Sequence, residues 1–140
     1  MRIDPARPSY EELCCYTLTH GDRAFIHQHV VDAFAAQAAD DHTKPVTLTF
    51  ALIGLYLHLE KQFTGRQVQL AHMKLAKRTR AWPTFSQPAD RGSVTAADVI
   101  AKPEGPERDQ AIDAWCRSVW DAYSGHRAAI VDILKAHHVI

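Results

Sequence analysis

The sequence lacks several features that would point directly to one class of protein. Its 140 residues contain three cysteines, and Cys14 and Cys15 are direct neighbours, so a disulfide framework is excluded as the basis of the fold. No apolar run reaches the roughly 18 residues that a membrane span needs, and the N-terminal segment has no apolar signal core. We therefore expect a cytoplasmic protein with reduced thiols and no membrane partner.

The chain also lacks an excess of charge of either sign. Sixteen Lys and Arg residues balance sixteen Asp and Glu residues, so no overall field attracts nucleic acid or an acidic substrate. A local basic run, Lys74, Lys77, Arg78 and Arg80, precedes Trp82. We interpret this run as the solvated outer face of a helix, and we do not expect nucleic acid as a partner.

Recognisable motifs of catalysis are absent. The sequence contains no HExxH, ExxH or CxxC metal motif and no glycine-rich phosphate loop. No serine or cysteine lies in a nucleophile elbow. These absences argue against the corresponding classes of cofactor-dependent enzyme, and they leave open whether the chain is an enzyme at all.

What is present is a composition typical of a globular helical protein. With 46% hydrophobic and 23% charged residues, residues 1–140 are sufficient for one domain with its own core. Apolar residues recur at helical spacing. The sequence predicts an all-α, single-domain bundle of four to six helices, with a long Pro- and Gly-containing loop (82–93) before the C-terminal helices. The expected helical segments are 10–19, 22–39, 44–63, 66–80, a short turn at 95–101, and 106–137.

Several residues mark where these helices begin or break. Ser9 with Glu12 has the form of a capping box, and Asp22 is a suitable N-cap for the second helix. Pro106 can open the last helix, which Ser124 and Gly125 can kink or split.

The last helix has one continuous apolar seam. Its members alternate at spacings of four and three: Ile112, Cys116, Val119, Tyr123, His126, Ile130, Ile133 and His137. Such a seam suits packing against a long helix, which can be internal or belong to another protomer. We predict self-association as a homodimer.

Nine histidines are the compositional oddity, and several occur on apolar helix faces. In the second helix His29 and Gln37 fall within the buried arc, His27 lies near its edge, and Asp32 borders the other side. In the third helix Thr47, Ala51, Gly54 and His58 share a small or polar face, where we expect His58 to meet solvent. Three further polar residues fall on inner stripes or apolar faces: Glu60, His72 and His126.

Interior imidazoles and carboxylates on different helices are how bundles assemble metal or acid–base sites. We therefore predict a pocket that binds a divalent metal such as Zn²⁺ or a small molecule. The predicted metal ligands are drawn from His27, His29, Asp32 and His126, with Gln37, Glu60 and His72 lining the pocket. His27 and His29 are alternatives, because their rings point about 200° apart on a helix. The alternative is a non-catalytic interaction or dimerisation module in which the same histidines are satisfied structural groups.

Two segments carry a family resemblance. His27 to Gln37, with Val31-Asp32-Ala33-Phe34 at its centre, and Ser118-Val119-Trp120 through His126 resemble segments of an uncharacterised bacterial domain-of-unknown-function family. The resemblance implies a helical fold and assigns no activity. A bundle with scattered histidines and a late Trp, Tyr and His is also similar to DinB-like metal-binding bundles, and that similarity implies a divalent metal.

Overall fold

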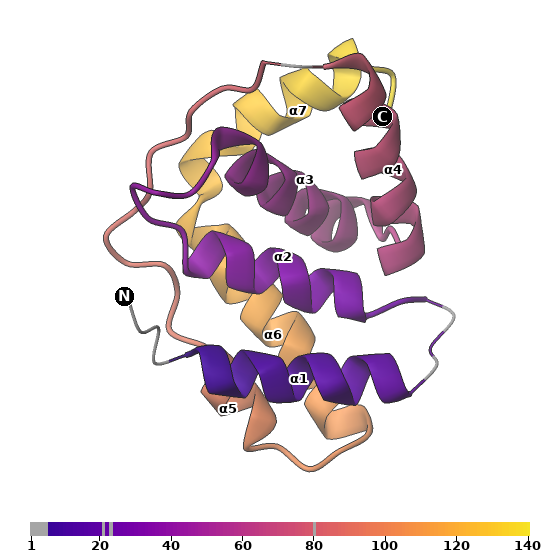
Figure 1. Cartoon of the computed structure of the whole chain (residues 1–140), viewed down its shortest axis with the longest axis vertical. Helices are drawn as coiled ribbons and strands as arrows, with labels where there is room; N and C mark the ends of the chain where they lie inside the picture. The colour runs from indigo at the N-terminus through magenta and orange to yellow at the C-terminus, as the bar shows by residue number, and fades with distance from the viewer. Residues whose placement is uncertain (1–5, 21, 23, 80) are drawn as a thin grey trace.

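The computed structural model describes residues 6–20, 22, 24–79 and 81–140 (Figure 1). Within these residues the chain forms helices and no β-strand, so the predicted all-α class is confirmed. The elements are α1 (Arg7–Thr19), α2 (His27–Gln37), α3 (Pro45–Lys61), α4 (Gly65–Arg78), α5 (Ala96–Ile100), α6 (Pro106–Ala122), the short 3-10 helix η1 (Ser124–His126) and α7 (Arg127–Ala136).

The seven α-helices of the described residues exceed the predicted four to six for two local reasons. The expected turn after Thr95 is a helix of its own, because Thr95 and Asp98 form a capping box at its start. The long C-terminal helix is split at Ser124 and Gly125, as the sequence indicated, into α6 and α7.

Two predicted helix starts are wrong. Helix α1 begins at Arg7 with Pro8 in its first turn, which leaves Ser9 inside the helix and not at its cap. Asp22 accepts hydrogen bonds from the backbone N–H groups of Ala24 and Ile26, so it caps a turn. Phe25 then adopts a left-handed φ of 57°, which delays the start of α2 to His27.

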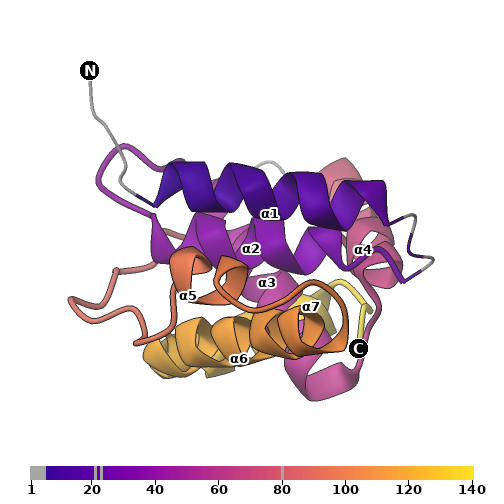
Figure 2. The same cartoon turned by 90° about the horizontal axis from the view of Figure 1, so that it is seen from below.

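Helix α3 is the centre of the bundle. It packs against α2, α4, α6 and α7, and its residues 51–57 are buried without interruption. A helix that is apolar on all sides is stable only when other elements enclose it. Helix α2 packs against α1, α3 and α6, and in the view of Figure 2 it lies between α1 and α6. None of the described helices is both long enough and apolar enough to cross a membrane.

The apolar seam of the last helix is filled within the chain. Ile112, Cys116, Val119, Tyr123 and Ile130 are each 1% exposed or less. The Tyr123 hydroxyl also donates a hydrogen bond of 2.6 Å to the Ala36 carbonyl on α2. Internal packing therefore accounts for these five members of the seam, whereas His126, Ile133 and His137 are half-buried.

A close contact between α2 and α3 depends on one glycine. A Cβ atom added to Gly54 would lie 1.9 Å from Oδ2 of Asp32, so the carboxyl group packs directly on the backbone of α3. Asp32 is 3% exposed. Its Oδ1 accepts a 3.1 Å hydrogen bond from the Gln28 amide, and Oδ2 has no partner among the described residues. The contact thus buries a carboxyl group with half of its hydrogen-bonding capacity unused.

We predict that Gly54→Ala lowers the free energy of unfolding by about 1–3 kcal/mol, because overpacking at Asp32 outweighs the gain in helix propensity. Urea unfolding followed by circular dichroism measures the change. In the double variant Asp32→Ala/Gly54→Ala the new methyl group has room. The losses of unfolding free energy in the two single variants should therefore add up to more than the loss in the double variant. Strictly additive losses would contradict the contact.

The buried carboxyl also predicts a pH dependence. Burial raises the pKa of Asp32 well above 3.8, so the folded chain keeps a proton that the unfolded chain loses. The stability linked to this proton is complete below about pH 4 and is lost as the pH rises through the folded pKa. Because Asn does not titrate, Asp32→Asn should gain stability relative to the wild type between about pH 4 and about pH 8.

Urea unfolding of the wild type and of Asp32→Asn, each at about pH 4 and at about pH 8, checks this prediction. The buried histidines titrate equally in both proteins, so their contributions cancel in the difference. A difference in unfolding free energy that stays constant with pH would mean that Asp32 is ionised in the folded chain.

Candidate functional site

Helix α2 carries a buried and incompletely bonded imidazole. The side chain of His29 is on the inner face of α2, where the residue is 4% exposed, and its Nδ1 has no hydrogen-bond partner among the described residues. Burial, and next the charge on His58, lower the pKa of His29 to about 3. The ring is therefore neutral at physiological pH, and the prediction that His29 points inward is confirmed.

His58 of α3 stacks on this ring. The two ring centroids are 3.5 Å apart and the ring planes differ by 13°. Nε2 of His58 lies 2.9 Å from Oδ1 of Asp113 on α6, so three helices meet at this group. The sequence placed His58 toward solvent, whereas its side chain is half-buried, with 17% exposed at the wall of a cavity.

Asp113 holds the charge of the group. Its hydrogen bond with His58 keeps the pKa of Asp113 below the ordinary 3.8, against burial, which raises it. Asp113 is thus ionised at neutral pH and accepts a hydrogen bond from Nε2–H of His58. When the ring carries its single proton on Nε2, Nδ1 is the nitrogen that can accept a hydrogen bond.

His29, His58 and Asp113 line one cavity of about 640 Å³. Its other polar walls include Asp109 and Arg117 of α6. Its apolar walls include Ile26, Leu59 and Phe63. A cavity of this size with a few convergent polar groups on an apolar lining is typical of small-molecule sites.

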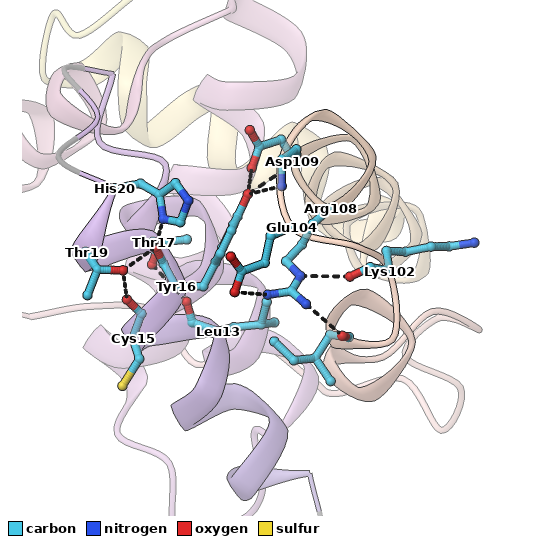
Figure 3. Close-up of polar contacts among 12 residues, drawn as sticks. Leu13, Cys15, Tyr16, Thr17, Thr19, His20, Lys102, Glu104, Arg108 and Asp109 are labelled. Carbon is cyan, nitrogen blue, oxygen red and sulfur yellow. Dashed lines mark hydrogen bonds and ion pairs between the residues drawn. The ribbon is translucent and has the colours of Figure 1, made fainter.

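Asp109 is fixed by a cluster that joins α1 to the start of α6 (Figure 3). The Tyr16 hydroxyl donates a 2.8 Å hydrogen bond to Asp109 and accepts a 3.1 Å one from the Gly105 amide. The guanidinium of Arg108 lies 4.8 Å from the Tyr16 ring centroid and donates to the carbonyls of Ile100 and Lys102. This cluster holds the Asp109 end of the cavity in place.

The four predicted metal ligands do not converge. Nδ1 of His27 is 3.0 Å from the Thr17 hydroxyl on α1. His126 contacts Ser86 in the long loop, 2.8 Å from its carbonyl oxygen, and Asp32 packs on Gly54. Across the described ranges, no group of three or more His, Cys, Asp and Glu side chains is arranged to hold a metal ion. Of the predicted set, His29 alone lines the cavity described above.

The three predicted pocket residues each have protein partners. Gln37 accepts a 2.9 Å hydrogen bond from the Trp115 indole, and it donates one to the Val94 carbonyl. Glu60 accepts hydrogen bonds from Trp120 and Arg127. His72 is bonded through Nε2 to the carbonyl of Phe50, and burial lowers its pKa to about 4. These contacts hold helices and loops together.

Sequence reasoning missed Asp113 and Arg117 and misjudged His58. One indication was available for His58, because it lies one turn after Gly54 on the small face of α3, and small faces allow close helix contacts. Another was the spacing of Asp109, Asp113 and Arg117, which places three charged groups on one face of α6.

Comparison with known proteins supports the family resemblance. A family model described as a family of unknown function, DUF5946, matches residues 7–124. No curated protein and no solved structure matches the chain, so the similarity to DinB-like bundles is not confirmed. The matched range includes α1 through α6 and therefore His29, His58 and Asp113. The chain belongs to DUF5946, a family of unknown function.

Proposed function

We propose that this chain binds a small polar molecule in the cavity between α2, α3 and α6, and that His58 accepts a hydrogen bond or a proton from it. The observation that carries the proposal is the 2.9 Å contact between His58 and Asp113 at the cavity wall. A carboxylate on one ring nitrogen fixes the tautomer and makes the other nitrogen a stronger base.

The stacked His29 ring supports the same role. It covers one face of His58 with a neutral aromatic surface, which limits the directions from which water reaches His58. Because the pKa of His29 is lowered to about 3, its ring adds no positive charge beside His58 at neutral pH.

The remaining walls suit a molecule with both polar and apolar parts. Leu59 and Phe63 provide apolar surface for a carbon skeleton. Arg117, one helical turn after Asp113 on α6, provides a cation. Polar groups that are few and fixed orient a ligand, whereas apolar surface contributes most of the binding free energy.

Divalent-metal binding, with Zn²⁺ as the leading ion, stays a prediction. His29 supports it, because a neutral ring nitrogen without a partner is a donor that zinc accepts. The ring planes of His29 and His58 are nearly parallel. One of these two rings would therefore have to turn before both could bind the same ion. The prediction fails if no zinc purifies with the untagged chain and added zinc does not raise its melting temperature.

Self-association as a homodimer also stays a prediction. Leu70 and Met73, one turn apart on α4, are 57% and 53% exposed and offer an apolar surface for it. A monomer mass in light scattering at high micromolar concentration would remove this prediction.

The test of the proposed function is a thermal-shift screen of the untagged chain against small carboxylic acids, alcohols, amides, amines and phosphate esters. A ligand of the cavity should raise the melting temperature of the wild type. His58→Gln and Asp113→Asn should each weaken its binding about tenfold, because both remove the oriented acceptor. Isothermal titration calorimetry measures the dissociation constants.

His42→Gln is the matched control, because it removes an exposed imidazole outside the cavity and should leave binding unchanged. The proposal is overturned if every stabilising compound binds His58→Gln and Asp113→Asn as tightly as it binds the wild type. It is also overturned if no compound of any class stabilises the wild type.

A further inference from the structure

The outward side of α4 combines exposed apolar side chains with exposed cations. Arg66, Leu70, Met73 and Lys77 follow one another at spacings of four, three and four residues, so at 100° per residue they fall within an arc of about 60°. Leu70 and Met73 each have more than half of their surface exposed. We call this stripe of four residues, about 16 Å long, the α4 outer face.

The α4 outer face is not the side through which the helix joins the bundle. Val68, Ala71 and Leu75 are buried on the inner side. Leu70 and Met73 lie on the opposite side, one turn apart, with a cation at each end of the stripe. Apolar residues at the centre and charged residues at the rim are the arrangement found in protein–protein interfaces.

The cations of α4 are not neutralised within the described part of the chain. The helix contains Arg66, Lys74, Lys77 and Arg78 and no Asp or Glu, whereas the whole chain has no net charge. None of the four takes part in an ion pair among the described residues. Arg66 and Lys74 donate hydrogen bonds to uncharged acceptors, a glutamine amide and a backbone carbonyl. The uncompensated positive charge favours an acidic partner.

The same arrangement argues against three other occupants. An amphipathic helix binds a membrane surface through its wide apolar side, and on α4 that side is buried in the bundle. Nucleic acid is bound through its phosphates, which leave Leu70 and Met73 without an apolar partner. A second copy that used its own α4 outer face would bring like charges together.

We propose that the α4 outer face docks an amphipathic helix of another protein that carries an acidic residue on each side of an apolar pair. The two acidic residues pair with Arg66 and Lys77, and the apolar pair covers Leu70 and Met73. Side chains spaced by three and four residues on both helices let the ridges of one fit into the grooves of the other. The face does not line the cavity of the proposed function, so the two proposals are independent.

Fluorescence polarisation with a labelled helical peptide tests the proposal at an ionic strength of about 0.05 M. The peptide carries Glu, Leu, Leu and Glu at the spacing of the α4 outer face on an Ala-rich background, and the matched peptide carries Lys in place of Glu. The Glu peptide should bind the untagged chain, and the Lys peptide should not. Lys77→Glu should weaken binding of the Glu peptide about three- to tenfold. Leu70→Ser/Met73→Ser should weaken it about tenfold.

Two control variants make the same chemical changes elsewhere. Lys102→Glu reverses the charge of an exposed residue between α5 and α6, and Leu18→Ser removes an apolar side chain of α1 that is 56% exposed. Both should leave binding unchanged. All the substituted residues are exposed, so circular dichroism should show the same helix content in every variant.

The docking proposal is overturned if the wild type does not bind the Glu peptide or binds both peptides equally. Unchanged binding by Leu70→Ser/Met73→Ser would also overturn it, because charge alone would then hold the peptide, and nucleic acid or an anionic lipid surface would serve as well. A wild-type dimer in light scattering that Leu70→Ser/Met73→Ser converts into a monomer would assign the face to a second copy and contradict the proposal.

Discussion

The contact between the carboxyl group of Asp32 and the backbone of Gly54 is the constraint on which the rest of the structure depends. A side chain at position 54 would push α2 and α3 apart. With glycine there, the helices approach closely enough for His29, one turn before Asp32, to stack on His58, one turn after Gly54. The group formed by His29, His58 and Asp113, and the cavity that these residues line, thus follow from how α2 and α3 pack.

This packing places several titratable groups in or near the interior. Asp32 and Cys116 are buried with raised pKa values, and His29 and His72 are held neutral by burial. Such groups oppose folding unless they have partners, and Oδ2 of Asp32 and Nδ1 of His29 have none among the described residues. Of these four groups, His29 lines the cavity of the candidate site, and a perturbed pKa in a cavity is characteristic of functional sites.

The class of the fold and several helix boundaries could be predicted from the sequence, because periodicity and caps are local. Pro106, Thr95 and the break at Ser124 are examples. The start of α2 could not be predicted from the sequence, because it depends on the left-handed backbone at Phe25 and not on the capping ability of Asp22.

The site was predicted less well for a related reason. The inward direction of His29 follows from helical spacing, but its neighbours do not. His58 and Asp113 become partners through the relative placement of α3 and α6, which no local pattern encodes. His27 and His126 were grouped with His29 by their positions on helix faces, and their contacts with Thr17 and Ser86 depend on where α1 and the long loop lie.

The most direct test of this account is the protonation state of the His29 ring, followed by ¹⁵N–¹H nuclear magnetic resonance as the pH is lowered. A ring buried between α2 and α3 and stacked on His58 should stay neutral down to about pH 4, because its pKa is lowered to about 3. If His29 instead takes up a proton near pH 6.5, the ordinary value for histidine, the ring is solvated and the packing described above is wrong.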